Sequence, residues 1–90
     1  MIKKYDINRI SNILNNKIIK YELLSNSFNI NCVKILLENK KKLIVKYYSK
    51  KENNFNAIVS EGKNLDFLRH KNLNYFPKVI FRNHIYLITE

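Results

Sequence analysis

Apolar residues near the start of the chain recur with a helical period. Ile7, Ile10 and Leu14 are spaced by three and four residues, so their side chains share one face of a helix. Asp6 stands directly before them and is expected to be the N-cap. The pattern stops near Asn15, and we therefore predict a short amphipathic helix at the N-terminus.

Three β-strands are predicted next. Residues 17–24, 32–37 and 43–48 are rich in Ile, Val, Leu and Tyr, and polar segments separate them. The connections are short, which favours an antiparallel arrangement of neighbouring strands. The basic run 40–42 lies in the second connection, where a solvated turn is the expected structure.

A second helix is predicted after a polar segment that follows the third strand. One side of this helix is formed, at spacings of three and four, by Ile58, Glu61, Gly62, Leu65, Leu68 and Arg69. Asn53 or Asn54 is available as the cap of this helix, which is expected to end by about Asn72.

The remaining apolar segments complete the expected fold. Residues 79–81 and 85–88 follow Pro77 and predict a second hairpin. The element order favours an α+β fold with a five-stranded antiparallel sheet, one helix packed on it after the third strand, and a short N-terminal helix. No linker or repeat divides the sequence, so residues 1–90 are expected to form a single domain.

Two charged residues interrupt the apolar faces of these elements. Lys46 lies inside the third predicted strand, and Glu61 lies between Ile58 and Leu65 on the apolar side of the second helix. Because an unpaired buried charge costs on the order of several kcal/mol, we expect Lys46 to pair with Glu61. The alternative is that each reaches solvent from the border of its apolar surface. Gly62, inside the same helix, predicts a close approach by another backbone or side chain.

The strongly basic composition adds an alternative function. A formal net charge of +10 is compatible with a nucleic-acid or anionic-membrane partner. However, Asn, Lys and Ile, whose codons are rich in A and T, make up nearly half of the chain, so genome composition could account for many of the lysines. Nucleic-acid binding is therefore an alternative that charge alone supports.

Several classes of protein are not expected from the remaining residues. Cys32 is the only cysteine, no apolar run reaches the length of a membrane span, and the first ten residues lack the apolar core of a signal peptide. We therefore expect a cytoplasmic protein. Cys32, His70 and His84 lack metal-ligand spacing, and Asp6 and Asp66 are expected to be a helix cap and a helix-surface residue.

Five segments, in order along the chain, carry a family resemblance. They are LSNSFNINCVKI at 24–35, LIVK at 43–46, SEGKNLDFLR at 60–69, FPKVI at 76–80 and IYLITE at 85–90. Together they resemble the N-terminal lobe of protein-kinase-like enzymes. More specifically, they resemble the fructosamine kinase (ketosamine-3-kinase) and aminoglycoside phosphotransferase group.

The resemblance implies an ATP-binding site. Lys46 would hold the α- and β-phosphates, and Glu61 on the helix would orient it. Thr89 would lie at the back of the adenine pocket, and the backbone of Glu90 would begin the hinge that binds adenine. The residues over the phosphates would be Ser27, Phe28, Asn29 and Asn31. The glycines usual in this loop of the family are absent here, so these side chains would have to replace backbone donors.

The resemblance also implies what a complete enzyme would do. It would transfer the γ-phosphate of ATP, with Mg²⁺, to a sugar-amine or aminoglycoside-like hydroxyl. In the family, the catalytic aspartate, the metal ligands and the acceptor pocket belong to a C-terminal lobe, so no catalytic residue is predicted in these 90 residues. The expected partners are that lobe or a second copy bound through an exposed inter-lobe face. The alternatives are a small basic nucleic-acid-binding module and a non-catalytic interaction domain.

Overall fold

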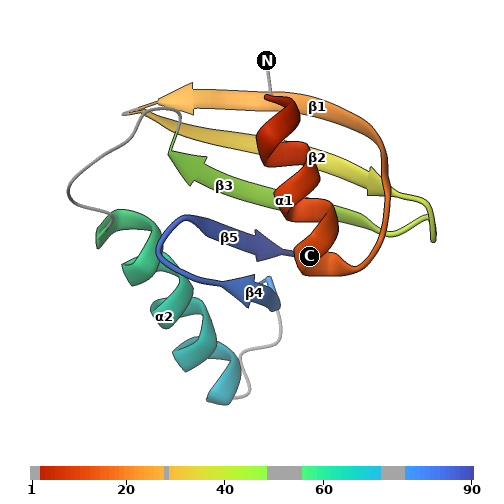
Figure 1. Cartoon of the computed structure of the whole chain (residues 1–90). Helices are drawn as coiled ribbons and strands as arrows, with labels where there is room; N and C mark the ends of the chain where they lie inside the picture. The colour runs from red at the N-terminus through yellow and green to blue at the C-terminus, as the bar shows by residue number, and fades with distance from the viewer. Residues whose placement is uncertain (1–2, 28, 49–55, 72–76) are drawn as a thin grey trace.

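The five strands that the structure describes form one antiparallel sheet in the order β1-β2-β3-β5-β4 (Figure 1). The structure, a computed structural model, describes residues 3–27, 29–48, 56–71 and 77–90. Its elements are α1 (Lys4–Leu14), β1 (Ile18–Ser27), β2 (Ile30–Leu37), β3 (Lys42–Tyr48), α2 (Asn56–His70), β4 (Val79–Arg82) and β5 (Tyr86–Thr89). The predicted α+β fold, with its five-stranded antiparallel sheet and two helices, is confirmed.

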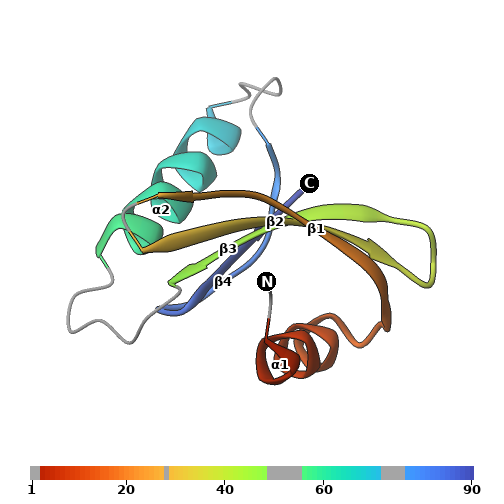
Figure 2. The same ribbon diagram turned by 90° about the horizontal axis from the view of Figure 1, so that it is seen from above.

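The two helices lie on opposite faces of the sheet (Figure 2). α2 packs on one of these faces, against β4 and β5. α1 crosses the other face over the middle of the sheet. The described residues therefore form three layers, whereas the sequence predicted that only the helix after the third strand packs on the sheet.

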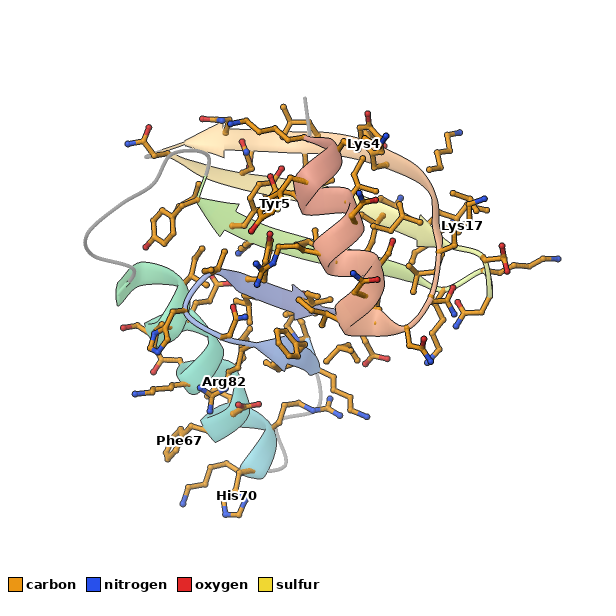
Figure 3. All side chains as sticks on the ribbon, in the orientation of Figure 1. Lys4, Tyr5, Lys17, Phe67, His70 and Arg82 are labelled. Carbon is orange, nitrogen blue, oxygen red and sulfur yellow. The ribbon has the colours of Figure 1, made fainter. Side chains whose placement is uncertain are left out.

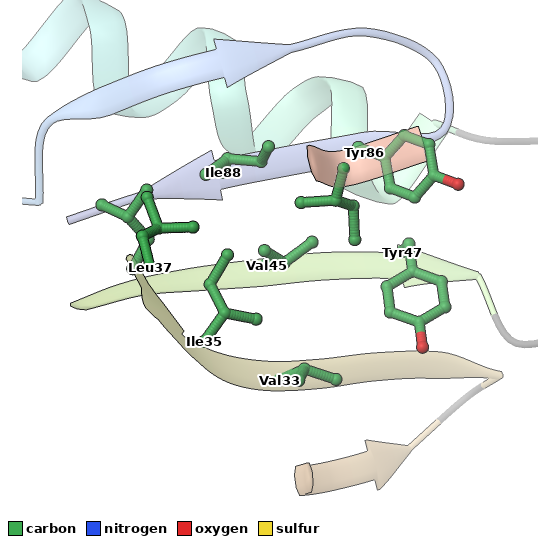
Figure 4. Packing of buried hydrophobic residues seen from close by; sticks show 9 residues of the cluster. Val33, Ile35, Leu37, Val45, Tyr47, Tyr86 and Ile88 are labelled. Atoms are coloured by element: carbon green, nitrogen blue, oxygen red, sulfur yellow. The ribbon is translucent and has the colours of Figure 1, made fainter. Parts of the chain in front are cut away.

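The main hydrophobic core lies between the sheet and α1 (Figure 4). Side chains alternate along a strand, so every second residue of β2, β3 and β5 faces α1. Ile10 of α1 is fully buried against this layer. The buried strand residues of the cluster are Val33, Ile35, Leu37, Leu43, Val45, Tyr47, Tyr86 and Ile88.

Asp6 does not cap α1, and the prediction of a cap was wrong. The helix begins at Lys4 with Lys3 as its N-cap, so Asp6 lies inside the first turn, where a negative charge is favourable near the helix N-terminus. The Tyr86 hydroxyl donates a hydrogen bond of 2.7 Å to Oδ1 of Asp6, which joins α1 to β5. The predicted end of the helix is confirmed, because Asn15 is a left-handed C-cap with φ of 49°.

The first hairpin has longer strands than the sequence predicted. β1 continues to Ser27 and β2 begins at Ile30, so much of the expected polar loop is paired strand. Polar residues favoured a loop here, but the amide of Asn26 donates to the side-chain oxygen of Asn31 on the opposite strand. Cross-strand bonding of this kind allows polar side chains within a hairpin. Asn29, with φ of 61°, provides the left-handed residue that the tight turn requires.

The second half of the fold differs from prediction mainly at its turns. Asn53 and Asn54, the candidate caps of α2, lie outside the described residues, and the helix ends at His70. Arg82 was expected in the turn of the second hairpin but belongs to β4. The turn is held instead by Asn83, whose Oδ1 accepts hydrogen bonds from the backbone N–H groups of Ile85 (2.8 Å) and Tyr86 (2.6 Å).

Candidate functional site

The predicted pairing of Lys46 with Glu61 is confirmed. Lys46 lies in the centre of the sheet, opposite Cys32 of β2 and Leu87 of β5, and its side chain extends from β3 to α2. Its Nζ lies 2.9 Å from Oε1 and 2.7 Å from Oε2 of Glu61. Both carboxylate oxygens therefore accept hydrogen bonds from one ammonium group.

Gly62 sets the distance between α2 and the second hairpin. A Cβ atom at this position would lie 2.8 Å from Cδ of Arg82 and 3.3 Å from Cδ1 of Leu87. The predicted close approach is confirmed, and the approaching groups are side chains of β4 and β5. Because the helix lies this near the hairpin, Glu61, the preceding residue, is held within reach of the lysine on β3.

The Lys46–Glu61 pair is less buried than its place on two apolar faces predicted. The Lys46 and Glu61 side chains are 34% and 40% exposed. The physical reason is that α2 packs on β4 and β5 rather than over β3, so the pair lies beside the helix contact. A pair this exposed contributes about 0–1 kcal/mol to stability. The pair therefore fixes the position of the ammonium group and contributes little to the stability of the fold.

A second ion pair fixes the same helix to the sheet. Arg82 reaches from β4 toward α2, and its Nε lies 2.6 Å from Oδ2 of Asp66 (Figure 3). Asp66 is on the helix surface as predicted, but sequence periodicity gave no indication of its partner, because Arg82 was expected in a turn. With Gly62, this pair helps to set the position of α2 on the hairpin.

Thr89 and Glu90 lie at the end of β5, on the strand that pairs with the lysine strand β3. Thr89 is opposite Ile44, the residue that shares a sheet face with Lys46, and it is 8% exposed. The backbone N–H of Glu90 donates to the carbonyl oxygen of Lys78 at 3.0 Å. That donor is therefore used within the fold. The predicted adenine-binding roles of both residues stay predictions.

Of the four predicted phosphate-covering residues, the structure describes the side chains of Asn29 and Asn31. Phe28 and the side chain of Ser27 lie outside the described residues, and Asn29 forms the hairpin turn. The buried side chain of Asn31 lies on the α1 face, opposite to the face of Lys46, and bonds with Asn26. It would have to leave this position to contact a phosphate held by Lys46, so its role also stays a prediction.

A tyrosine cluster on the α1 face was not predicted as a unit. The rings of Tyr47 and Tyr86 have centroids 5.9 Å apart, and both residues are buried. Burial raises the pKa of Tyr86 well above its ordinary value, and its hydrogen bond to Asp6 raises that pKa further. Burial likewise raises the pKa of Tyr47, while a hydrogen bond with Asn31 opposes the shift. The alternation of β3 and β5 indicated buried tyrosines, but not their contact with Asp6.

These raised pKa values predict that stability falls in alkaline solution. Above the ordinary tyrosine value of 10.0, the unfolded chain loses the Tyr86 proton while the folded chain keeps it, so the free energy of unfolding decreases as pH rises. Each such group contributes a slope of about 1.4 kcal/mol per pH unit. Urea unfolding of the wild type and Tyr86→Phe, measured from neutral pH to above pH 10, should show a shallower alkaline decrease in the variant. Equal slopes would contradict the assignment.

Comparison with known proteins finds no protein family, curated protein or solved structure that matches this chain. Within the described ranges, neither helix has the length and apolar character needed to cross a bilayer. The same residues include no group of three or more His, Cys, Asp or Glu side chains that could hold a metal ion.

Proposed function

We propose that this chain is a nucleotide-binding lobe in which Lys46, oriented by Glu61, binds the α- and β-phosphates of ATP. The observation that carries the proposal is the bidentate contact of the Lys46 ammonium with the Glu61 carboxylate, at 2.9 and 2.7 Å. Protein kinases use an ion pair between a strand lysine and a helix glutamate to place the lysine against ATP.

The chemistry of the ammonium group fits a phosphate ligand. A lysine side chain has three N–H donors, and Glu61 accepts two of them. The third can donate to a phosphate oxygen, and the partial exposure of the pair leaves a route for a ligand to reach it. A carboxylate that holds the lysine in one conformation lowers the entropy lost when the phosphate binds.

The arrangement of the elements also supports the proposal. α2 connects β3 to the β4–β5 hairpin, and β5 pairs directly with β3, so the lysine strand lies between the first hairpin and the strand that ends at Thr89.

By resemblance, the complete protein would be a small-molecule kinase of the fructosamine kinase type. It would transfer the γ-phosphate of Mg²⁺-bound ATP to a sugar-amine or aminoglycoside-like hydroxyl, with a C-terminal lobe supplying the metal ligands and the catalytic groups.

Nucleotide titration of the 90-residue chain tests the proposal. Isothermal titration calorimetry at physiological salt should show saturable binding of ATP and ADP with Mg²⁺. AMP should bind about tenfold or more weakly, because it lacks the β-phosphate that Lys46 is proposed to hold.

Three results would count against a nucleotide site. One is the absence of saturable ATP binding. Another is equal affinity for AMP and ATP. The third is displacement of ATP by an oligonucleotide, with binding that weakens steeply as salt rises, which would instead favour a basic nucleic-acid-binding module.

A further inference from the structure

The outer edge of the sheet at β1 has unusual exposure of apolar side chains. β1 pairs with β2 on one side and is the first strand in the sheet order, so its other side is an edge. Residues 19–26 are all exposed. They include four large hydrophobic side chains, with exposed fractions of 53% for Ile19, 41% for Tyr21, 43% for Leu23 and 48% for Leu24. An exposed apolar edge of this kind is a template for pairing with another strand.

We propose that β1 pairs with β1 of a second copy of this chain, antiparallel, about a two-fold axis that passes through Tyr21. In an antiparallel pair about that axis, Tyr21 lies opposite the partner's Tyr21 and Ile19 lies opposite the partner's Leu23. Lys20 then lies opposite the partner's Glu22. Because the interface is symmetric, the Lys20–Glu22 contact occurs twice.

Charge selects this register over its neighbours. An axis through Lys20 would place the two Lys20 side chains opposite each other, and an axis through Glu22 would do the same with two carboxylates. Like charges directly opposite in a sheet are destabilising. An axis between Lys20 and Tyr21, or between Tyr21 and Glu22, would place both charges opposite Ile19, Tyr21 or Leu23. Among these registers, the axis through Tyr21 alone pairs the opposite charges.

The interior of β1 also suits a short, defined interface. The register with β2 shifts between Ile18 and Lys20 and again between Leu23 and Ser25, so the regular part of the strand is centred close to Tyr21. Such irregularities bend the strand and stop pairing from extending along the whole edge. The proposed contact therefore has a limited length and a single register.

The pairing would extend the main core across the interface. Tyr21 and Leu23 lie opposite Ile35 and Val33 of β2, which are buried on the α1 face. A two-fold axis perpendicular to the sheet keeps the α1 faces of both copies on the same side. Tyr21 of each copy would then cover apolar surface that is exposed in the isolated chain. β2 separates this edge from Lys46 on β3, so the inference is independent of the proposed nucleotide site.

Charge reversal tests the proposed register. Sedimentation equilibrium of the full chain should show a dimer for the wild type. Lys20→Glu and Glu22→Lys should each raise its dissociation constant about tenfold or more, because each places like charges opposite one another twice. The double variant Lys20→Glu/Glu22→Lys restores both contacts with the net charge unchanged, and it should dimerise like the wild type. A double variant that dissociates like the single variants would overturn the register.

Disulfide formation tests the position of the axis independently. In a Cys32→Ala background, Tyr21→Cys places two thiols on directly opposed residues, whose Cα atoms are about 4.5–5.5 Å apart in an antiparallel pair. That distance lies within the range of a disulfide. Leu23→Cys is the matched control, because its two copies would be about 13 Å apart along the strands.

The two cysteine variants should therefore behave differently on mild oxidation. We expect covalent dimers from Tyr21→Cys and few from Leu23→Cys, with circular dichroism confirming that both variants fold. A chain that stays monomeric at all concentrations, or equal cross-linking of the two variants, would overturn the proposal.

Discussion

Ile10→Ala is expected to lower the free energy of unfolding by about 2–5 kcal/mol, the cost of truncating a large buried aliphatic side chain. Ile10 is fully buried and belongs to the cluster formed by α1 with β2, β3 and β5. Alanine is the better helix former, so the loss would come from packing and not from helix propensity. For a domain whose total stability is about 5–15 kcal/mol, this loss would be a large fraction of the whole.

Urea denaturation followed by circular dichroism measures this loss. Ile80→Ala is the matched control, because Ile80 lies on β4 and is 39% exposed. Its truncation is expected to cost less than about 1 kcal/mol. If the two variants lost equal stability, the main core would not lie under α1.

Lys46→Met should weaken ATP binding about ten- to hundredfold. Methionine keeps most of the length and volume of the side chain but removes the ammonium group that is proposed to contact the phosphates. A hydrogen bond to a charged group contributes about 1.5–3 kcal/mol, which sets the expected range. The fold should be retained, because the Lys46–Glu61 pair is partly exposed and Glu61 can be hydrated when its partner is removed.

Lys34→Met separates this specific effect from the loss of positive charge. Lys34 lies on β2, on the same face of the sheet as Lys46, and is exposed. Its removal lowers the net charge by the same amount, so non-specific attraction of a polyanion should fall equally in the two variants. Calorimetric titration should show little change for Lys34→Met. Equal losses in both variants would indicate general electrostatic attraction and contradict a phosphate site at Lys46.

The ion pair was predictable because it follows from local periodicity. Strand alternation placed Lys46 on one face of β3, and helical spacing placed Glu61 within an apolar stripe. The two charges are opposite and lie on surfaces that were expected to pack together. Their pairing could therefore be predicted without information on contacts between distant parts of the sequence. The partial exposure of the pair was not predictable in the same way, since it depends on α2 lying over β4 and β5 rather than over β3.

The position of the main core was harder to predict from the sequence than the ion pair. Both faces of β3 carry apolar residues, and the longer helix was expected to cover the sheet. One signal was present: Leu43, Val45 and Tyr47 alternate without a charge, whereas Lys46 interrupts the other face. The uncharged face is the one buried under α1. The hydrogen bond between Asp6 and Tyr86 could not be predicted from the sequence pattern, because no periodicity relates residues 80 positions apart.

The place of β5 in the sheet has a consequence for the order in which the chain folds. β5 pairs with β3, in the interior of the sheet, and it supplies Tyr86 and Ile88 to the layer beneath α1. During synthesis, the N-terminal helix and the first three strands emerge long before this strand does. Their apolar faces therefore stay incompletely covered until residues 86–89 have left the ribosome. Contacts of such long sequence separation slow folding, and the open intermediate is the stage at which this chain is most exposed to aggregation.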